Sequence, residues 1–202
     1  MTTDRPAKPT ADTWMFPPPG AGWTVDQVRG LELPTDWELV DGVVVVKGMA
    51  VLWHNKVRDG VLRSLAESGG ASPYSVVSEQ CVLVDSHNVA KPDVIVYDER
   101  GLDVLELDCV PASAVALVVE VVSPGSMQDD RHRKPALFAA AGVPYYWRVE
   151  RGEDDLPVVH EFWRHHDTGE YVSAPERPRH TGKLETDRPF PVVMELPPLL
   201  GR

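Results

Sequence analysis

The apolar run ALVVEVV, residues 116–122, constrains the fold of this chain more than any other segment. A short run with four valines, closed by a Ser-Pro-Gly turn, is typical of a strand buried on both faces of a mixed or parallel sheet. Glu120 interrupts this run near its carboxyl end. Burying an isolated carboxylate is costly, so Glu120 is neutralised, paired or bound to a cation, unless the strand end is open to water.

Length and charge limit the classes of protein to which the chain can belong. Its 202 residues, 43% of them hydrophobic, suffice for one domain with a sizeable core. A net charge of −11 argues against a broad, nonspecific nucleic-acid binder, because such a protein gains affinity by neutralising phosphates. Any contact with nucleic acid must therefore be local. No apolar run is long enough to predict a membrane span.

The N-terminus and the cysteines suggest where the protein acts. Residues 1–21 are rich in Pro, Thr and Ala and lack the apolar segment of a secretory signal, so we expect a disordered leader before a single domain over 22–202. Cys81 and Cys109 lie far apart in the sequence and have no CxxC spacing. Together these features predict a reducing, cytoplasmic setting.

The first part of the predicted domain combines helices with one hairpin. Thr24 is a plausible N-cap for a short helix through VDQVRGLE, and Asp41-Gly42 is a strong hairpin signal inside WELVDGVVVV. Apolar residues recur at helical spacing from Val51 until the SGG segment at 68–70. We therefore expect an amphipathic helix after the hairpin.

Strands dominate the remainder of the chain. Three strand candidates are followed by a short helix and another strand, at residues 74–85, 91–99, 116–122, 130–142 and 144–150. A hairpin over 156–174, turning at 167–169, and a last apolar strand at 190–196 complete the pattern. The order helix, three strands, helix, strand predicts an α/β fold with a mixed sheet flanked by helices.

Two acids on successive strands suggest a metal site. Asp93 opens the apolar run VIVY and Glu120 lies near the end of the next strand. If these strands are neighbours, the two carboxylates converge on one edge of the sheet, the oxygen-rich environment that magnesium or manganese prefers. Lys134, 14 residues after Glu120 and near the start of the following helix, can reach back to supply a cation for the transition state.

The segments WELVDG, KPDVIV and LVVEVVSPGSMQDDRHRKPALFAAAGVPYYWRVE resemble the Uma-two family, bacterial proteins assigned a restriction-endonuclease-like, PD-(D/E)XK-type fold. The resemblance covers roughly residues 22–195. It implies a restriction-endonuclease-like mixed sheet flanked by helices, with added N- and C-terminal hairpins, and places Asp93 and Glu120 at the two acidic positions. The usual lysine, two residues after the second acid, is Val122 here. The resemblance implies that Lys134 takes over its role.

Other residues have both a functional and a structural interpretation. Glu38, in the WELVDG motif, could lend a third carboxylate, although glutamates on strands usually face solvent. His54 lies near the start of the long helix, where this superfamily often has an acid lining the site, although a lone helical histidine is more often structural. Lys134 also stands four residues after Asp130, so a surface ion pair is the competing interpretation of that lysine.

Two further groups are interpreted as structural. His165-His166 lies beside a predicted turn without the spacing of metal ligands, so we expect it to be solvated. Trp147 and Trp163 are more typical of a core than of a platform for stacking bases.

The sequence thus predicts a magnesium- or manganese-dependent endonuclease that hydrolyses DNA phosphodiester bonds, with Asp93 and Glu120 as metal ligands and Lys134 as a catalytic cation. An inactive, oligomeric binding or regulatory protein on the same fold is the alternative, and hydrolysis of a small phosphorylated ligand is a third possibility. We also expect a homo-oligomer, because the aromatic hairpin from Val158 to Val172 and the strand PVVMEL follow a core that is complete at residue 150 and leave apolar surface to be covered.

Overall fold

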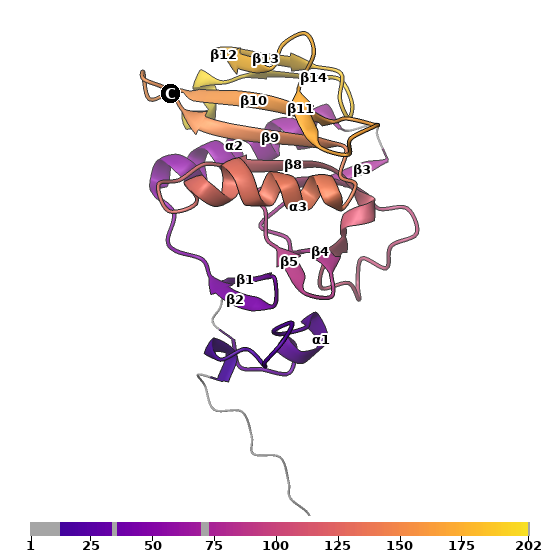
Figure 1. Cartoon of the computed structure of the whole chain (residues 1–202). Coiled ribbons are helices and arrows are strands. Elements are labelled where there is room, and N and C mark those ends of the chain that lie inside the picture. Colours follow the sequence, from indigo (N-terminus) through magenta and orange to yellow (C-terminus); the bar gives the residue numbers. More distant parts are fainter. Residues whose placement is uncertain (1–12, 34–35, 70–72, 202) are drawn as a thin grey trace, which may run out of the picture. The chain divides into compact units, whose positions relative to one another are not determined.

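The computed structural model describes residues 13–33, 36–69 and 73–201, which divide into two compact units (Figure 1). The first unit contains the chain up to Lys47 together with Leu83–Ala90, and the second contains Gly48–Val82 and the chain from Lys91 onward. The predicted leader lies outside the described residues over 1–12, and Thr13–Met15 forms a 3-10 turn, η1. The boundary at residue 22 stays a prediction.

The first unit is built on a small sheet in which four of its strands follow the order β2-β1-β5-β4. Its elements are α1 (Val25–Val28), β1 (Trp37–Val40), β2 (Val43–Val46), β4 (Val82–Asp85) and β5 (Asn88–Ala90). Helix α1 begins as predicted, because the Thr24 and Gln27 side chains and backbones cap one another reciprocally. It ends before Gly30 and is shorter than the sequence suggested.

The predicted hairpin is confirmed in β1 and β2. Strand β1 pairs antiparallel with β2, and Val40 lies opposite Val43 across the turn. Asp41 and Gly42 both have positive φ angles, 47° and 75°, as the tightest class of hairpin turn requires. The amide of Asp41 donates a hydrogen bond to Oδ1 of Asn88, 3.0 Å away, which fixes the turn against β5.

The second unit contains a larger mixed sheet in the order β11-β10-β9-β8-β6-β3, with β12 also paired to β10. Its elements are α2 (Leu52–Ser68), β3 (Tyr74–Ser78), β6 (Val94–Asp98), β7 (Val110–Pro111), η2 (Ala112–Ala114), β8 (Val115–Val121), η3 (Asp129–Arg133), α3 (Lys134–Ala140), β9 (Tyr145–Arg151), β10 (Pro157–Arg164), β11 (Tyr171–Ser173), β12 (Arg179–Thr181), β13 (Lys183–Thr186), β14 (Val192–Glu195) and η4 (Pro197–Leu200). Strands β3, β6 and β8 are successively antiparallel, whereas β8 and β9 are parallel and are connected through α3. The predicted mixed α/β organisation is therefore confirmed.

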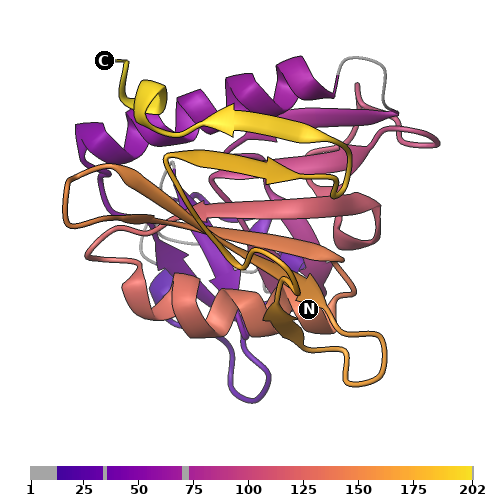
Figure 2. The ribbon, with the colours of Figure 1, turned by 90° about the horizontal axis from the view of Figure 1, so that it is seen from above.

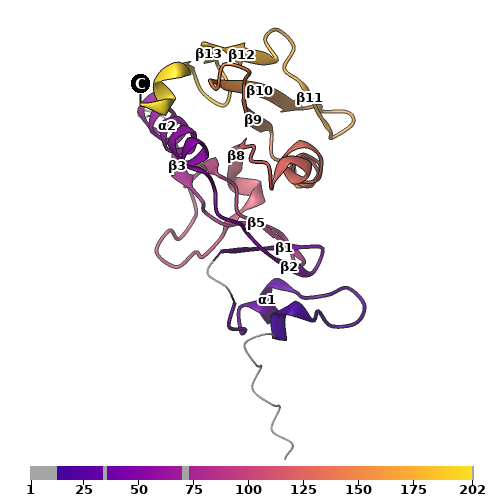
Figure 3. The ribbon, with the colours of Figure 1, turned by 90° about the vertical axis from the view of Figure 1, so that its left-hand side faces the viewer.

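Helices α2 and α3 cover opposite faces of this sheet (Figures 2 and 3). The face toward α2 is apolar, and the β13–β14 hairpin adds side chains to the same core. This core includes Val57, Val61 and Leu65 of α2, Val94, Val96, Leu117, Val119, Trp147, Val149 and Val159 of the sheet, and Leu184, Val192 and Met194 of the hairpin. The face toward α3 carries the polar residues considered below.

One predicted strand is divided in two. The sequence indicated a single strand over 74–85, but the chain leaves the sheet at Glu79, whose φ is 53°. Strand β3 pairs with β6 in the second unit, whereas β4 belongs to the sheet that contains β5. Positive φ is unfavourable for most residues, and no propensity pattern in the sequence indicated it at Glu79.

The two cysteines form a disulfide, which their spacing did not indicate. Cys81 and Cys109 are 28 residues apart, and their Cα atoms are 4.7 Å apart. They meet because the amide of Val110 donates a hydrogen bond to the carbonyl of Cys81. The cytoplasmic setting therefore stays a prediction. Within the part of the chain that the structure describes, no helix is long and apolar enough to cross a membrane.

The C-terminal hairpins bury some of their apolar residues and expose others. The hairpin of β10 and β11 turns as predicted, with Arg164 opposite Tyr171. Val159, Val192 and Met194 are buried within the second unit, whereas Val172 on β11 and Val193 on β14 are exposed. Further exposed valines lie on β2 of the first unit. A homo-oligomer stays a prediction.

Close packing between α2 and η4 makes Gly60 sensitive to substitution. A Cβ atom at Gly60 would lie 2.9 Å from Cδ2 and 3.0 Å from Cα of Leu199. We expect Gly60→Val to lower the free energy of unfolding by about 1–3 kcal/mol, because the added side chain meets backbone as well as side chain. Denaturant unfolding measures this change. Ala66→Val, at an exposed position of the same helix, is the control, and an equal loss in both variants would contradict the packing argument.

Candidate active site

The candidate site lies at the end of the second unit's sheet, where β6 begins and β8 ends. Val94 lies opposite Val119 in the antiparallel pair, so Asp93 and Glu120 reach the same end of two neighbouring strands. Asp93 bends over this end, and its Oδ2 accepts a hydrogen bond from the amide of Val121 at 2.7 Å. The structure therefore brings the two acids together at one end of the sheet, as predicted. Their chemical roles stay predictions.

Glu120 is paired with Lys134 inside the protein. Nζ of Lys134 donates to Oε1 of Glu120 at 2.9 Å and lies 3.5 Å from Oδ1 of Asp130. The exposed fractions of these three residues are 4%, 2% and 1%. Asp130 and Lys134 do pair, but the expectation of a surface pair is wrong, because both side chains are buried. The charge of Glu120 is compensated by a lysine from the helix.

A widened helical turn sets the position of Lys134. The amide of Lys134 donates to the carbonyl of Asp129, five residues earlier, in the π-helical turn η3. Pro135 has no amide hydrogen and disfavours a regular α-turn before it, so α3 begins at Lys134 after this wider turn. Lys134 therefore lies at the start of α3, as the sequence predicts.

His54 joins the site from the other helix. Its Nε2 lies 3.2 Å from Oδ2 of Asp93. Burial by itself lowers the pKa of His54, but the hydrogen bond and the negative charge of Asp93 outweigh it and raise that pKa above its ordinary value. His54 therefore helps to hold Asp93 in place. This contact links His54 to the candidate site and gives it more than a role in packing α2.

Asp130 is the site residue that sequence reasoning missed. Its Oδ1 is buried and has no hydrogen-bond partner among the described residues. Burial raises the pKa of the Asp130 carboxyl, and the Lys134 ammonium offsets this only in part. The hydroxyl of Tyr146 donates to its backbone carbonyl at 2.8 Å. The spacing of four residues to Lys134 was the available signal, but spacing alone does not distinguish a buried pair from an exposed one.

Glu38 lies in the first unit. It lies on β1 opposite Val45 and is 4% exposed, so it does not face solvent as most strand glutamates do. Its role as a further carboxylate stays a prediction.

The acids of the second unit fit a hard divalent cation. Carboxylate oxygens are the ligands that magnesium and manganese prefer, and Asp93 and Glu120 supply them from neighbouring strands. Oδ1 of Asp130 accepts no hydrogen bond among the described residues and lies 3.5 Å from the same lysine, so it is a further buried acceptor. An ion held by Glu120 would share that carboxylate with Lys134. We therefore consider Asp93 and Glu120 the residues that would hold such an ion.

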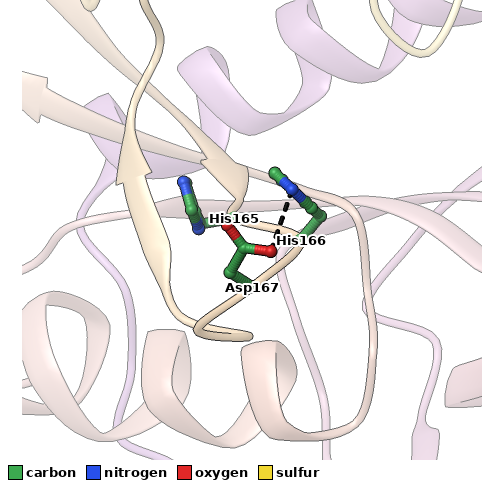
Figure 4. Close-up of side chains that lie close together, drawn as sticks. All are labelled: His165, His166 and Asp167. Atoms are coloured by element: carbon green, nitrogen blue, oxygen red, sulfur yellow. Dashed lines mark ion pairs between the residues drawn. The ribbon is translucent and has the colours of Figure 1, made fainter.

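A second cluster lies on the turn between β10 and β11 (Figure 4). Within the described ranges, His165, His166 and Asp167 form the one set of three such residues whose ligand atoms all lie within 4.8 Å of one another. His166 pairs with Asp167 at 3.0 Å, and their side chains are 84% and 70% exposed. The rings of His165 and His166 stack on each other. These consecutive residues on an exposed turn agree with the solvated interpretation.

The tryptophans considered as a stacking platform lie within the protein. Trp147 is fully buried in the α2-facing core. Trp163 is partly buried, and its indole donates to Glu161 at 2.9 Å. Both positions agree with structural roles.

The buried pair predicts a large effect of removing its cation. Without added metal, we expect Lys134→Met to lower the free energy of unfolding by roughly 3–5 kcal/mol, because Glu120 is left buried without its partner. The double variant Glu120→Gln/Lys134→Met should recover most of this loss. Denaturant unfolding of both variants measures the effect.

Arg133 provides the matched control, because it pairs with Asp129 at the protein surface. Arg133→Met should lower the free energy of unfolding by only about 0.2–0.5 kcal/mol. If Lys134→Met costs no more than Arg133→Met, the pair with Glu120 does not stabilise the folded protein.

Comparison with known proteins places the chain in a family. The family model Uma2, described as "Putative restriction endonuclease", matches residues 26–186. A crystal structure of "a putative nuclease belonging to DUF820" from Anabaena variabilis ATCC 29413 superposes with a TM-score of 0.60 at 14% identity, over 81% of this chain and 87% of that one. At this identity the match shows a shared fold. No curated protein matches. Because the family model spans most of the sequence, this chain belongs to the Uma2 family.

Proposed function

We propose that the protein is a magnesium- or manganese-dependent endonuclease that hydrolyses DNA phosphodiester bonds. The observation that carries this proposal is the buried contact of 2.9 Å between Lys134 and Glu120, beside Asp93 on the neighbouring strand. The order α2, β3, β6, β8, α3, β9 supports a restriction-endonuclease-like, PD-(D/E)XK-type core. The description of the Uma2 family supports the same reaction class.

The proposal gives each residue a chemical task. Asp93 and Glu120 would hold the ion, and His54 and the amide of Val121 keep the Asp93 carboxylate oriented. When bound, a divalent cation lowers the pKa of a coordinated water and stabilises negative charge on a phosphoryl group. Lys134 supplies a fixed positive charge beside the same carboxylate, where charge develops on the attacked phosphate.

The position of Lys134 also bears on the absent lysine at residue 122. A lysine at residue 122, directly after β8, would project from the same strand face as Glu120, two residues earlier. Val122 cannot provide a charge there. Lys134 reaches Glu120 from the crossover between β8 and β9, so the cation comes from a different element. This contact supports the interpretation that Lys134 takes over the role.

The alternative is an inactive binding or regulatory protein on the same fold, with the buried pair as a structural element. Val122 and the net charge of −11 favour this alternative. The two experiments that follow separate it from the endonuclease.

Metal binding tests the acids directly. Calorimetric titration with manganese should show binding to the parent protein and its loss in Asp93→Ala and in Glu120→Ala, because each variant removes a ligand oxygen. Asp98→Ala, at the opposite end of β6, should bind as the parent does. Unchanged binding in both site variants would show that the proposed ligands are wrong.

Cleavage tests the lysine. Lys134→Met should retain manganese binding while cleaving plasmid or single-stranded DNA about 10²–10³ times more slowly, which is the order of loss expected when one electrostatic stabiliser is removed. If the variant still binds manganese, unfolding is excluded as the cause of its slower cleavage. If the variant cleaves as fast as the parent, Lys134 only neutralises Glu120. If the parent cleaves no nucleic acid with magnesium or manganese, the binding alternative holds.

A further inference from the structure

A row of basic residues crosses the sheet from the candidate site. Glu120 on β8 lies opposite Arg148 on β9, Arg148 lies opposite His160 on β10, and His160 lies opposite Arg179 on β12. Residues directly opposite one another in paired strands project from the same face. Neighbouring strands are about 4.8 Å apart, so the row extends roughly 14 Å from Glu120. The strands that carry it lie side by side in Figure 1.

Arg131, at the beginning of the α3 segment, adds a further positive charge beside this row. Its guanidinium donates to both carboxylate oxygens of Glu150, at 3.1 and 2.7 Å. Nε of Arg148 lies 2.7 Å from the same carboxylate. Burial acts to raise the pKa of Glu150, but Arg131 and Arg148 outweigh it and lower that pKa, so the group is ionised. One carboxylate is thus shared by two arginines.

The local charge is opposite to that of the whole protein. Arg131, Arg148 and Arg179 contribute three positive charges against the one negative charge of Glu150, which leaves an excess of two. Burial and the charge of Arg148 lower the pKa of His160, so its imidazole is neutral near pH 7 and acts as a hydrogen-bonding group. This excess stands on a chain of net charge −11, where nucleic acid can be attracted only locally.

Arg131 and Arg148 are held in place by their partners, and the arginines remain accessible at least in part. The guanidinium of Arg148 lies 5.2 Å from the centre of the Phe162 ring, and its side chain is 19% exposed. The side chain of Arg131 is 36% exposed, and Arg179 is exposed. Guanidinium groups fixed by stacking and pairing lose little further freedom when they bind phosphate.

We propose that Arg131, Arg148, His160 and Arg179 bind the phosphodiester backbone of one DNA strand, next to the phosphate that is cleaved at Glu120. This inference rests on the proposed endonuclease function and specifies how its substrate is held. Arg148, His160 and Arg179 lie in single file, as one backbone requires, and Arg131 lies beside them. Guanidinium forms paired hydrogen bonds with phosphate. We call these four residues the DNA track; they orient the strand and give no base specificity.

The test is binding without cleavage. In the presence of EDTA, fluorescence anisotropy with a short labelled DNA oligonucleotide, single-stranded and then duplex, should show weaker binding by Arg131→Ala/Arg179→Ala than by the parent. The expected loss is about tenfold or more near 0.1 M salt. The slope of log affinity against log salt should fall by about 1–2 units, since two phosphate contacts are removed.

Two further variants make the result specific. Arg179→Glu changes an exposed side chain and should weaken binding even if the double variant folds poorly. Arg100→Ala is the matched control, because Arg100 is 75% exposed and pairs with Asp98 at the opposite end of β6. Arg100→Ala should bind as the parent does.

The outcomes separate this inference from the endonuclease itself. If the parent cleaves DNA with manganese while both row variants bind it as tightly as the parent, the basic row is not the DNA track. If the row variants lose binding but the parent never cleaves, the track is supported and the endonuclease function fails. If the parent binds no DNA at low salt, the track is overturned.

Discussion

The buried ion pair between Lys134 and Glu120 is the interaction on which the candidate site depends. A carboxylate inside a valine-rich strand is tolerated because a lysine from the crossover helix lies 2.9 Å away. The wide turn that precedes Pro135 places Lys134 at the beginning of α3, where its side chain makes this contact. Asp130 and Asp93 lie around this pair, so the fold concentrates several acids at one sheet end.

The two faces of the large sheet divide stability from chemistry. Helix α2 and the β13–β14 hairpin bury apolar side chains on one face, and this packing is insensitive to charge. The opposite face carries Glu120, Arg148 and Glu150 with the α3 segment above them. His54 reaches the site from α2 by contacting Asp93 where the strand begins. A rigid apolar layer therefore supports a polar one.

Charge is distributed unevenly over that polar face. Acids gather where β6 begins and β8 ends, whereas Arg148 on β9 and Arg179 on β12 place positive charge farther across the sheet. A protein with a net charge of −11 can engage a polyanion only through such a local arrangement, because its remaining surface repels phosphate. The proposed metal ligands and the proposed DNA track are thus two parts of one row across the sheet.

The sequence by itself determined the local elements and much of the site. The Asp41-Gly42 turn, the Thr24 cap, the helix from residue 52 and the strands around Asp93 and Glu120 follow from short-range preferences, which operate within a few residues. The split at Glu79, the disulfide of Cys81 and the burial of Asp130 were decided only by the tertiary structure. Each depends on which distant segments pack together, and no local sequence pattern predicts that packing. The alignment of Glu120, Arg148, His160 and Arg179 has the same origin, because strand register is fixed by packing across the whole sheet.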